Sequence, residues 1–380
     1  MAKTLNPVDA TYYRLLQDIL ANGYEKSDRT GTGTLSVFGR NVRFDCRDGK
    51  IPLLTTKKIY TKGVISELLW FLQGRTDLRW LLENDNTIWV GDAYKNYLNK
   101  WKPKEDFKSN THNEYLNQEL VNEKPLSRDL FILCIKTDDE FSKKWGNLGP
   151  IYGKQWRKWT KTKVKIAKDG IPMGYSVEFI DQLQNAINTL LTNPDSRRNL
   201  VTSWQPSEIE EMTLPPCHIG FQFYTRKLTE TERLKIYQKN NPNYVPHDHI
   251  ESEMDENNIP KREISLKWEQ RSVDTPLGLP FNIASYGLLL HIIGKIVNMV
   301  PGDLIGDLGD THIYLNQIDG IKEQLKRSSN CEVPTIKHLK SDEFYQALKT
   351  DLSKLSEINV DDFQIIDYNP HPIIKMPLSN

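Results

Sequence analysis

The sequence has few cysteines, and those it has are far apart. The four lie at positions 46, 134, 217 and 331 and include no Cys-x-x-Cys pair. Such scatter is typical of neither a zinc site nor a disulfide framework. We therefore expect free thiols, a reducing cytoplasmic location and no bound metal.

The chain also lacks a net charge, a long apolar run and an export signal. Fifty Lys and Arg balance fifty Asp and Glu, so no overall field attracts a nucleic-acid polymer or an anionic membrane. No apolar run approaches the roughly 20 residues of a membrane span, and residues 1–4 do not begin a signal peptide. We expect a globular protein that binds neither nucleic acid nor membrane.

What is present is material for a large core, because 38% of the residues are hydrophobic and nine are tryptophan. Apolar periodicity predicts helices over residues 9–23 (capped by Asp9), 64–72, 177–191, 282–300 and 315–326. β-Branched and aromatic runs predict strands over 34–37 and 41–44, paired as a hairpin around Gly39, and over 200–204, 219–225 and near 304–305. Helices and strands do not alternate regularly, which indicates an α+β fold. We interpret residues 1–380 as one catalytic domain.

Two polar stretches break this pattern, at about 95–144 and 226–261. They contain turn-forming residues and no internal repeat. We predict two surface insertions, whose function the sequence does not indicate.

The strongest chemical signal is Cys217, in a Pro-Pro-Cys-His run that ends at His218. A thiol attacks carbon as the thiolate, and a nearby cation such as Arg271 favours that form. The alternative is an inert buried thiol, to which we assign the other three cysteines. On a strand, His218 would face away from Cys217, so we expect it to support the network around the sulfur.

Other residues suit an anion and a proton relay. Arg29, in a Gly-rich turn, and the adjacent Arg197 and Arg198 offer rigid forks of donors to phosphate oxygens, although each alone also fits an exposed turn. Glu67 lies in an apolar run, where desolvation raises a carboxyl pKa and favours proton transfer. A solvent-facing glutamate is the alternative there. Asn282 either caps a helix or reads the edge of a base.

Taken together and in order, these motifs resemble the thymidylate synthase family. The likeness spans nearly the whole chain outside the insertions and is carried by eight runs, which begin at Arg29, Glu67, Gly149, Pro194, Pro215, Gln270, Pro280 and Gly309. It implies a large mixed β-sheet flanked by helices. It also implies a homodimer in which each active site borrows Arg197 and Arg198 from the partner subunit.

The resemblance further implies the substrate, the one-carbon donor and the roles of the site residues. Cys217 would add to C6 of dUMP, while Glu67 and Tyr152 move protons. The implied substrate-binding residues are Arg29, Arg197, Arg198, Gln270, Arg271, Ser272, Asp274, Asn282, His312 and Tyr314, with Asn282 on the pyrimidine ring. The residues implied to meet 5,10-methylenetetrahydrofolate are Lys57, Trp89, Asp274, Leu277 and Gly278. We place His218, Trp89, Asn282 and Asp92 among the catalytic residues as well.

Two departures from the family pattern bear on the product. The stretch that commonly reads Ile-Trp-Asp in synthases is Ile-Trp-Val-Gly-Asp here, so Asp92 falls where a bulky or amide side chain is expected. A carboxylate there can position or deprotonate a water molecule. The chain also ends on the polar Asn380 in place of a small aliphatic residue.

From these departures we expect a dUMP hydroxymethylase, similar to bacteriophage enzymes, which makes 5-hydroxymethyl-dUMP and tetrahydrofolate. The alternative is a thymidylate synthase that makes dTMP and dihydrofolate. A third hypothesis is a non-catalytic RNA-binding regulator, which the neutral charge balance disfavours.

Overall fold

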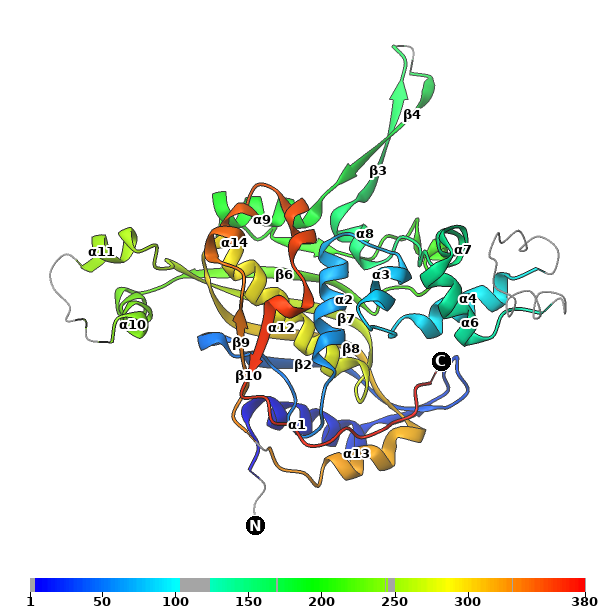
Figure 1. The fold of residues 1–380 in the computed structure, drawn as a ribbon, viewed down its shortest axis with the longest axis horizontal. Helices are drawn as coiled ribbons and strands as arrows, with labels where there is room; N and C mark the ends of the chain where they lie inside the picture. Colours follow the sequence, from blue (N-terminus) through cyan, green and yellow to red (C-terminus); the bar gives the residue numbers. More distant parts are fainter. Residues whose placement is uncertain are drawn as a thin grey trace.

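The computed structural model describes residues 4–102, 124–168, 170–242, 244, 250–329 and 331–379. Its centre is a six-stranded sheet in the order β1-β2-β8-β7-β6-β5 (Figure 1). Strands β7 and β8 are parallel and the other neighbours are antiparallel, which confirms the predicted mixed sheet. The strands are β1 Tyr24–Lys26, β2 Thr34–Asp45, β5 Leu200–Thr202, β6 His218–Lys227, β7 Arg262–Asp274 and β8 Val300–Tyr314.

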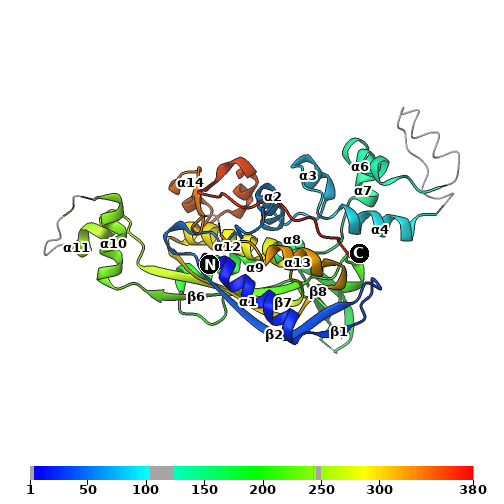
Figure 2. The same cartoon turned by 90° about the horizontal axis from the view of Figure 1, so that it is seen from below.

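Helices cover one face of this sheet (Figure 2). The central one, α12 (Gly278–Val297), packs on β7 and β8 and is buried along most of its length. It is the one helix in the described part of the chain that is long and apolar enough to span a membrane, but 83% of that apolar window is buried inside the fold. The expectation that no segment approaches such a length was therefore wrong, and the segment is a core helix.

The remaining elements surround this centre. The α-helices are α1 Pro7–Asn22, α2 Thr61–Leu72, α3 Leu78–Glu83, α4 Val90–Lys100, α6 Arg128–Thr137, α7 Asp139–Trp145, α8 Tyr152–Arg157, α9 Gln182–Thr192, α10 Glu230–Asn240, α11 Ile250–Glu256, α13 Ile318–Gln324 and α14 Asp342–Ala347. Short 3-10 helices cover Arg47–Gly49, Ile209–Glu211, Leu315–Gln317, Leu352–Glu357 and Val360–Asp362. Two further strand pairs are β3 Trp159–Ile166 with β4 Pro172–Ile180, and β9 Thr335–His338 with β10 Phe363–Ile366.

Several element boundaries differ from the expectations. Gly39 does not turn a hairpin, because β2 runs unbroken through it along β8; its φ of 70° bends the strand without ending it. Asn6, and not Asp9, caps α1, and Asp9 accepts hydrogen bonds from Thr55 and Thr56. Helix α12 ends at Val297 and not at residue 300, because the backbone of its C-cap Asn298 is left-handed. Pro301 and Gly302 therefore lie in β8.

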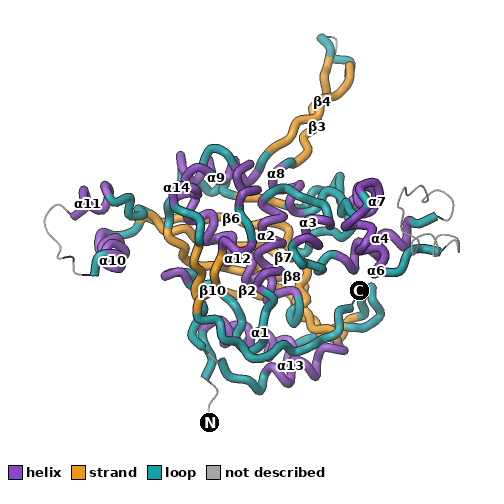
Figure 3. The backbone as a smooth tube through the Cα atoms, viewed as in Figure 1, coloured by secondary structure: helices purple, strands orange, loops and turns teal. Residues whose placement is uncertain are grey.

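The segment 177–191 was predicted as one helix, but its first residues belong to β4. Strands β3 and β4 form a hairpin that projects well beyond the body of the molecule (Figures 1 and 3). Asp181 then caps α9, since its side chain accepts from the backbone N–H of Gln184. This hairpin was missing from the expectations.

Both predicted insertions contain helices and lie at opposite ends of the molecule (Figure 1). Helices α6 and α7 and most of α4 belong to the stretch 95–144, of which residues 103–123 lie outside the described residues. The stretch 226–261 carries α10 and α11, which share a small hydrophobic cluster of Tyr237, Ile250, Met254 and Ile259. The main core draws on residues from Val8 to Phe363. The single-domain interpretation stays a prediction.

Candidate active site

Cys217 lies directly before β6, where α8 and β7 hold its backbone. Its N–H donates to Tyr152 Oη at 2.8 Å, and its carbonyl accepts from the Arg271 N–H at 2.8 Å. The Arg271 side chain also donates to the carbonyls of Pro216 (2.8 Å) and Pro215 (3.2 Å). The two prolines therefore contribute carbonyl acceptors that lock Arg271 beside the cysteine.

The electrostatic setting of Cys217 combines opposing effects. Burial raises the pKa of the thiol, the guanidinium groups of Arg271 and Arg29 lower it, and the carboxylates of Asp92 and Asp274 raise it. The expected effect of Arg271 is present, but burial exceeds it, so the net pKa shift is upward. The resting sulfur is a thiol that becomes a nucleophile only when a proton acceptor or a bound ligand changes this balance.

The residues predicted to relay protons form a buried group next to Tyr152, which bonds to the cysteine backbone. Trp89 Nε1 donates to Glu67 Oε1 at 2.8 Å, and burial raises the pKa of Glu67 to about 7. The Trp89 ring lies edge-on to Tyr152, with centroids 6.0 Å apart. Glu67 is only 8% exposed, so the alternative of a solvent-facing glutamate is wrong.

His218 belongs to the same buried region but does not contact the sulfur through any described hydrogen bond. Its ring stacks on Tyr152 with centroids 4.2 Å apart, and its Nδ1 lies 2.8 Å from Tyr286 Oη. Burial lowers the pKa of His218 to about 3, so the imidazole is neutral. It packs among the aromatic side chains of Tyr152 and Tyr286.

The amide of Asn282 is fixed by its neighbour on β7. Gln270 Nε2 donates to Asn282 Oδ1 at 3.0 Å and to the Ser272 carbonyl at 3.1 Å. Gln270 Oε1 in turn accepts from Trp268 Nε1 at 3.1 Å. Asn282 lies inside α12, whose N-cap is Leu277, so the helix-cap alternative is wrong.

The predicted phosphate-binding arginines fall into two groups. Arg29 is exposed on a loop that the Asp28 carboxylate organises by accepting from the N–H groups of Thr30 (2.7 Å) and Gly33 (2.8 Å). Like Arg271, it acts on the pKa of Cys217. Arg197 and Arg198 are exposed on the loop before β5 and are not among the charges that act most strongly on that thiol.

The ends of β7 and β8 bring together Asp274, His312 and Tyr314. Asp274 is the register partner of His312, whose ring is perpendicular to that of Tyr314, with centroids 5.2 Å apart. Asp274 Oδ1 accepts from the Leu277 N–H at 3.1 Å, next to Gly278 at the start of α12, and burial raises the pKa of Asp274. Asp274 is close enough to Cys217 for its carboxylate charge to raise the pKa of the thiol.

Lys57 approaches Asp274 from the segment before α2. Its ammonium donates to the Pro276 carbonyl. Burial lowers the pKa of Lys57 to about 8, although the charge of Asp274 opposes that shift. A buried cation therefore lies beside the half-buried carboxylate of Asp274.

The two departures from the family pattern, Asp92 and the C-terminal segment, lie in different parts of the structure. Asp92, in the first turn of α4, is close enough to act on Cys217, and burial raises its own pKa while Arg29 lowers it. The C-terminal segment passes beside Tyr314, since Gln317 Nε2 donates to the Pro377 carbonyl at 3.1 Å and Asn316 Nδ2 to Ser379 Oγ at 3.3 Å. Asn380 lies outside the described residues.

Several residues that contact the predicted site residues were not indicated by the sequence. Trp204 lies under the Arg271 guanidinium at 5.4 Å, and Asp310 Oδ1 lies 3.2 Å from His312 Nδ1. Tyr286, whose Oη lies 2.8 Å from His218 Nδ1, belongs to the sequence run that begins at Pro280. No cluster of three or more His, Cys, Asp or Glu side chains arranged for a metal occurs among the described residues.

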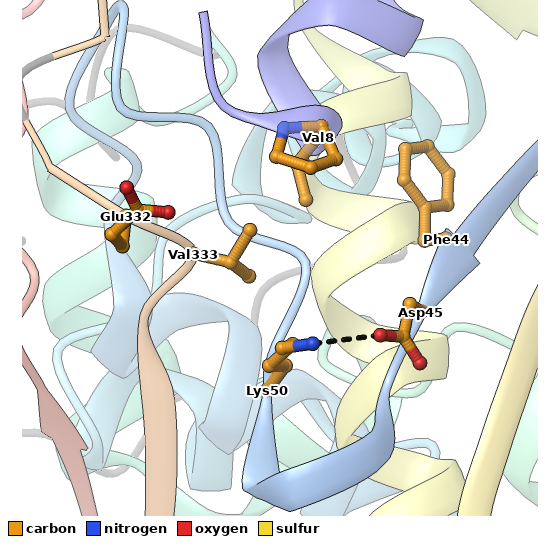
Figure 4. Close-up of a pocket in the computed structure, with 7 residues that line it drawn as sticks. Val8, Phe44, Asp45, Lys50, Glu332 and Val333 are labelled. Atoms are coloured by element: carbon orange, nitrogen blue, oxygen red, sulfur yellow. Dashed lines mark hydrogen bonds and ion pairs between the residues drawn. The ribbon is translucent and has the colours of Figure 1, made fainter.

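A separate cavity of about 170 Å³ lies between α1, β2 and residues 332–333 (Figure 4). Its lining includes the ion pair of Lys50 with Asp45, at 2.7 Å, and none of the candidate active-site residues. It is therefore distinct from the candidate active site.

Comparisons with known proteins agree with this arrangement. The model of the family described as thymidylate synthase matches residues 10–380. A thymidylate synthase of Mycoplasma mobile is 38% identical over 364 residues, which cover 96% of this chain and 97% of the relative. A thymidylate synthase of Listeria monocytogenes is 36% identical over 372 residues, covering 97% and 99%. The chain therefore belongs to the thymidylate synthase family.

Proposed function

We propose that this protein is a thymidylate synthase that converts dUMP and 5,10-methylenetetrahydrofolate to dTMP and dihydrofolate. Similarity to two enzymes of that name over almost the whole chain supports this function over the expected hydroxymethylase. The observation that carries the proposal is the placement of Cys217 between Tyr152 and Arg271. A nucleophile, a cation and a buried acid converge there, as covalent catalysis requires.

The paired amides of Gln270 and Asn282 support uracil as the base. Because Gln270 donates to Asn282 Oδ1, the amide oxygen retains one lone pair for the uracil N3–H. Asn282 Nδ2 then faces O4 as a donor. Cytosine reverses both groups, and each mismatch in a buried site costs about 1–3 kcal/mol.

Cys217 and Glu67 divide the chemistry of the first step. The sulfur forms a bond to C6, the C5–C6 π electrons move toward C5 and O4, and the thiol proton passes to a base. With a pKa near 7, Glu67 can both give and accept a proton near neutral pH. Tyr152 bonds to the Cys217 backbone and packs against Trp89, so it holds the sulfur at a fixed position relative to the proton relay.

The residues around Asp274 suit a folate. The half-buried carboxylate of Asp274, which also accepts from the Leu277 N–H, matches the N–H edge of a pterin, and Lys57 supplies a buried cation nearby. When bound, methylenetetrahydrofolate supplies the one-carbon unit and the hydride. Trp89 and the C-terminal segment beside Tyr314 would exclude water from the reacting carbon.

We further propose a homodimer that forms through the sheet face opposite the helices. Leu200 is 49% and Tyr224 70% exposed on that face, next to the loop that carries Arg197 and Arg198. An isologous contact there would give each loop a neighbouring active site. The four free cysteines fit the reducing cytoplasm proposed as its location.

Hydroxymethylation is the second candidate, and Asp92 is the observation that favours it. A carboxylate whose charge reaches Cys217 could hold a water molecule near C5. Product analysis separates the two candidates. Incubation with dUMP and methylenetetrahydrofolate should give dTMP and dihydrofolate in equal amounts, and 5-hydroxymethyl-dUMP with tetrahydrofolate would overturn the proposal.

Asp92→Asn is the matched control for that experiment. In a synthase this variant should keep dTMP as its product. In a hydroxymethylase it should lose most of the hydroxymethylated product, because the amide cannot deprotonate water.

A further inference from the structure

The projecting hairpin has two chemically different faces. Its register pairs Thr160 with Phe179, Thr162 with Val177, and Val164 with Tyr175. Paired residues share a face and successive residues alternate. One face therefore carries Val164, Ile166, Tyr175, Val177 and Phe179, and the other carries Lys161, Lys163, Lys165, Ser176 and Glu178.

The apolar face is open to solvent in the single chain. Tyr175 is 74%, Phe179 64% and Val164 59% exposed. Of the 19 large hydrophobic side chains exposed in the described part of the chain, seven lie in this hairpin: Val164, Ile166, Ile171, Met173, Tyr175, Val177 and Phe179. Such a concentration marks an interaction site, since exposed apolar residues are normally scattered.

The charged face has its own partners. Glu178 accepts from Lys163 at 2.6 Å and lies 3.7 Å from Lys161. This face therefore suits solvent, and a polyanion bound to its lysines would leave the opposite apolar face uncovered. A two-stranded hairpin is at best marginally stable by itself in water, so covering the apolar face would stabilise the whole arm.

We propose that the apolar face of this hairpin packs against a second copy of the chain. The proposal rests on the homodimer suggested above and assigns the dimer a contact outside the sheet. The hairpin joins α8 to α9, and α9 leads directly into the loop of Arg197 and Arg198 and then into β5. The arm is therefore continuous in the chain with the surface proposed to meet the partner.

The length of the arm is sufficient for this contact. The eight residues of β3 extend about 26 Å, at about 3.3 Å per residue. Two sheets stacked face to face lie about 10 Å apart, which is less than half the length of the arm. A two-fold axis would supply two such arms, and each would tie the base of α9 to the other subunit.

Two matched triple variants test the assignment. The first replaces the apolar face by Val164→Thr, Tyr175→Thr and Val177→Thr, and the second replaces the charged face by Lys161→Thr, Lys163→Thr and Ser176→Thr. Threonine keeps β-propensity in both. In sedimentation equilibrium, the apolar-face variant should raise the dimer dissociation constant at least about tenfold, while the charged-face variant stays within about threefold of wild type.

A second measurement uses the unmodified protein, so that it does not depend on a variant folding. Ordinary and nitrogen-15-labelled subunits are mixed and treated with an amine cross-linker. The lysines of the hairpin should then form links of mixed isotopic mass. A wild-type dimer with equal dissociation constants for both variants, and only single-isotope links from the hairpin, would overturn the proposal.

The activity assay separates this proposal from the proposed function. If the wild type is a dimer that makes dTMP and the apolar-face variant dimerises equally well, only the hairpin contact is contradicted. A wild type that stays monomeric defeats the hairpin contact and the homodimer together. Absence of dTMP formation is a failure of the proposed function.

Discussion

Among single residues, Glu67 makes the clearest pH-dependent prediction. Burial raises its pKa in the folded state from 4.5 to about 7, so the folded protein holds this proton more tightly than the unfolded chain does. The resulting stability is complete below about pH 4.5 and is lost as the pH rises through about 7, by up to about 3 kcal/mol. Relative to Glu67→Gln, which cannot titrate, the wild-type free energy of unfolding should fall by that amount between about pH 5 and about pH 8.

Urea denaturation of both proteins across this pH range measures the effect. Glu67→Asp is a useful companion, since it keeps the titrating group. Parallel pH profiles of wild type and Glu67→Gln would mean that the carboxyl is not desolvated in the folded state.

Asn282 makes a prediction about specificity. Asn282→Asp removes the donor to O4 of uracil and leaves Gln270 Nε2 bonded to a carboxylate. We expect kcat/KM for dUMP to fall by about tenfold to a hundredfold and the preference to shift toward dCMP. Steady-state kinetics with both nucleotides measure the ratio, and unchanged discrimination would contradict the assigned role.

The sequence motifs predicted the individual site residues but not the contacts between them. Cys217, Glu67 and Asn282 stand in recognisable runs. The bond from Gln270 to Asn282 depends on the placement of α12 against β7, and the stacking of Arg271 over Trp204 joins residues 67 positions apart in the chain. Such contacts depend on how elements pack, which local patterns do not determine.

At the scale of elements, Gly39 explains how β2 stays continuous. With φ at 70°, it bends the strand where a residue with a side chain would be strained, and an added Cβ would meet no atom within 4 Å. Gly39→Ala should therefore cost about 1–2 kcal/mol from backbone strain alone. Gly39→Asn should cost less, because asparagine tolerates this region.

Chemical denaturation of the two variants at Gly39 measures the difference. Equal stability of wild type and Gly39→Ala would indicate that the backbone there relaxes to an ordinary strand conformation. The same glycine explains the wrong hairpin prediction. A glycine between two β-rich runs fits both a turn and a bend, and only the pairing with β8 distinguishes them.

Other element boundaries were ambiguous for similar reasons. The alternation in β4 is clear once its face is known, but residues 177–180 also fit the first turn of the helix that follows. The long helix α12 was predicted well, because its apolar residues form an unbroken core segment. Long periodic segments were therefore predictable, and an exposed hairpin with one apolar face was not.

For the whole molecule, the proposed exchange of Arg197 and Arg198 between subunits makes a testable prediction. Cys217→Ser and the double variant Arg197→Ala, Arg198→Ala should each be nearly inactive. After unfolding and refolding together, half of the dimers are hybrids with one complete site, so about a quarter of wild-type activity should return. Activity that does not rise on mixing would contradict the exchange of arginines between subunits.

The account as a whole depends on a covalent bond between Cys217 and C6 of dUMP. Mass spectrometry of the enzyme, quenched during turnover with dUMP and methylenetetrahydrofolate and digested, tests it most directly. We predict that the peptide containing Cys217 gains the mass of the nucleotide, and that the same peptide from Cys217→Ser does not. Steady dTMP formation with an unmodified Cys217 peptide at every quench time would contradict the account.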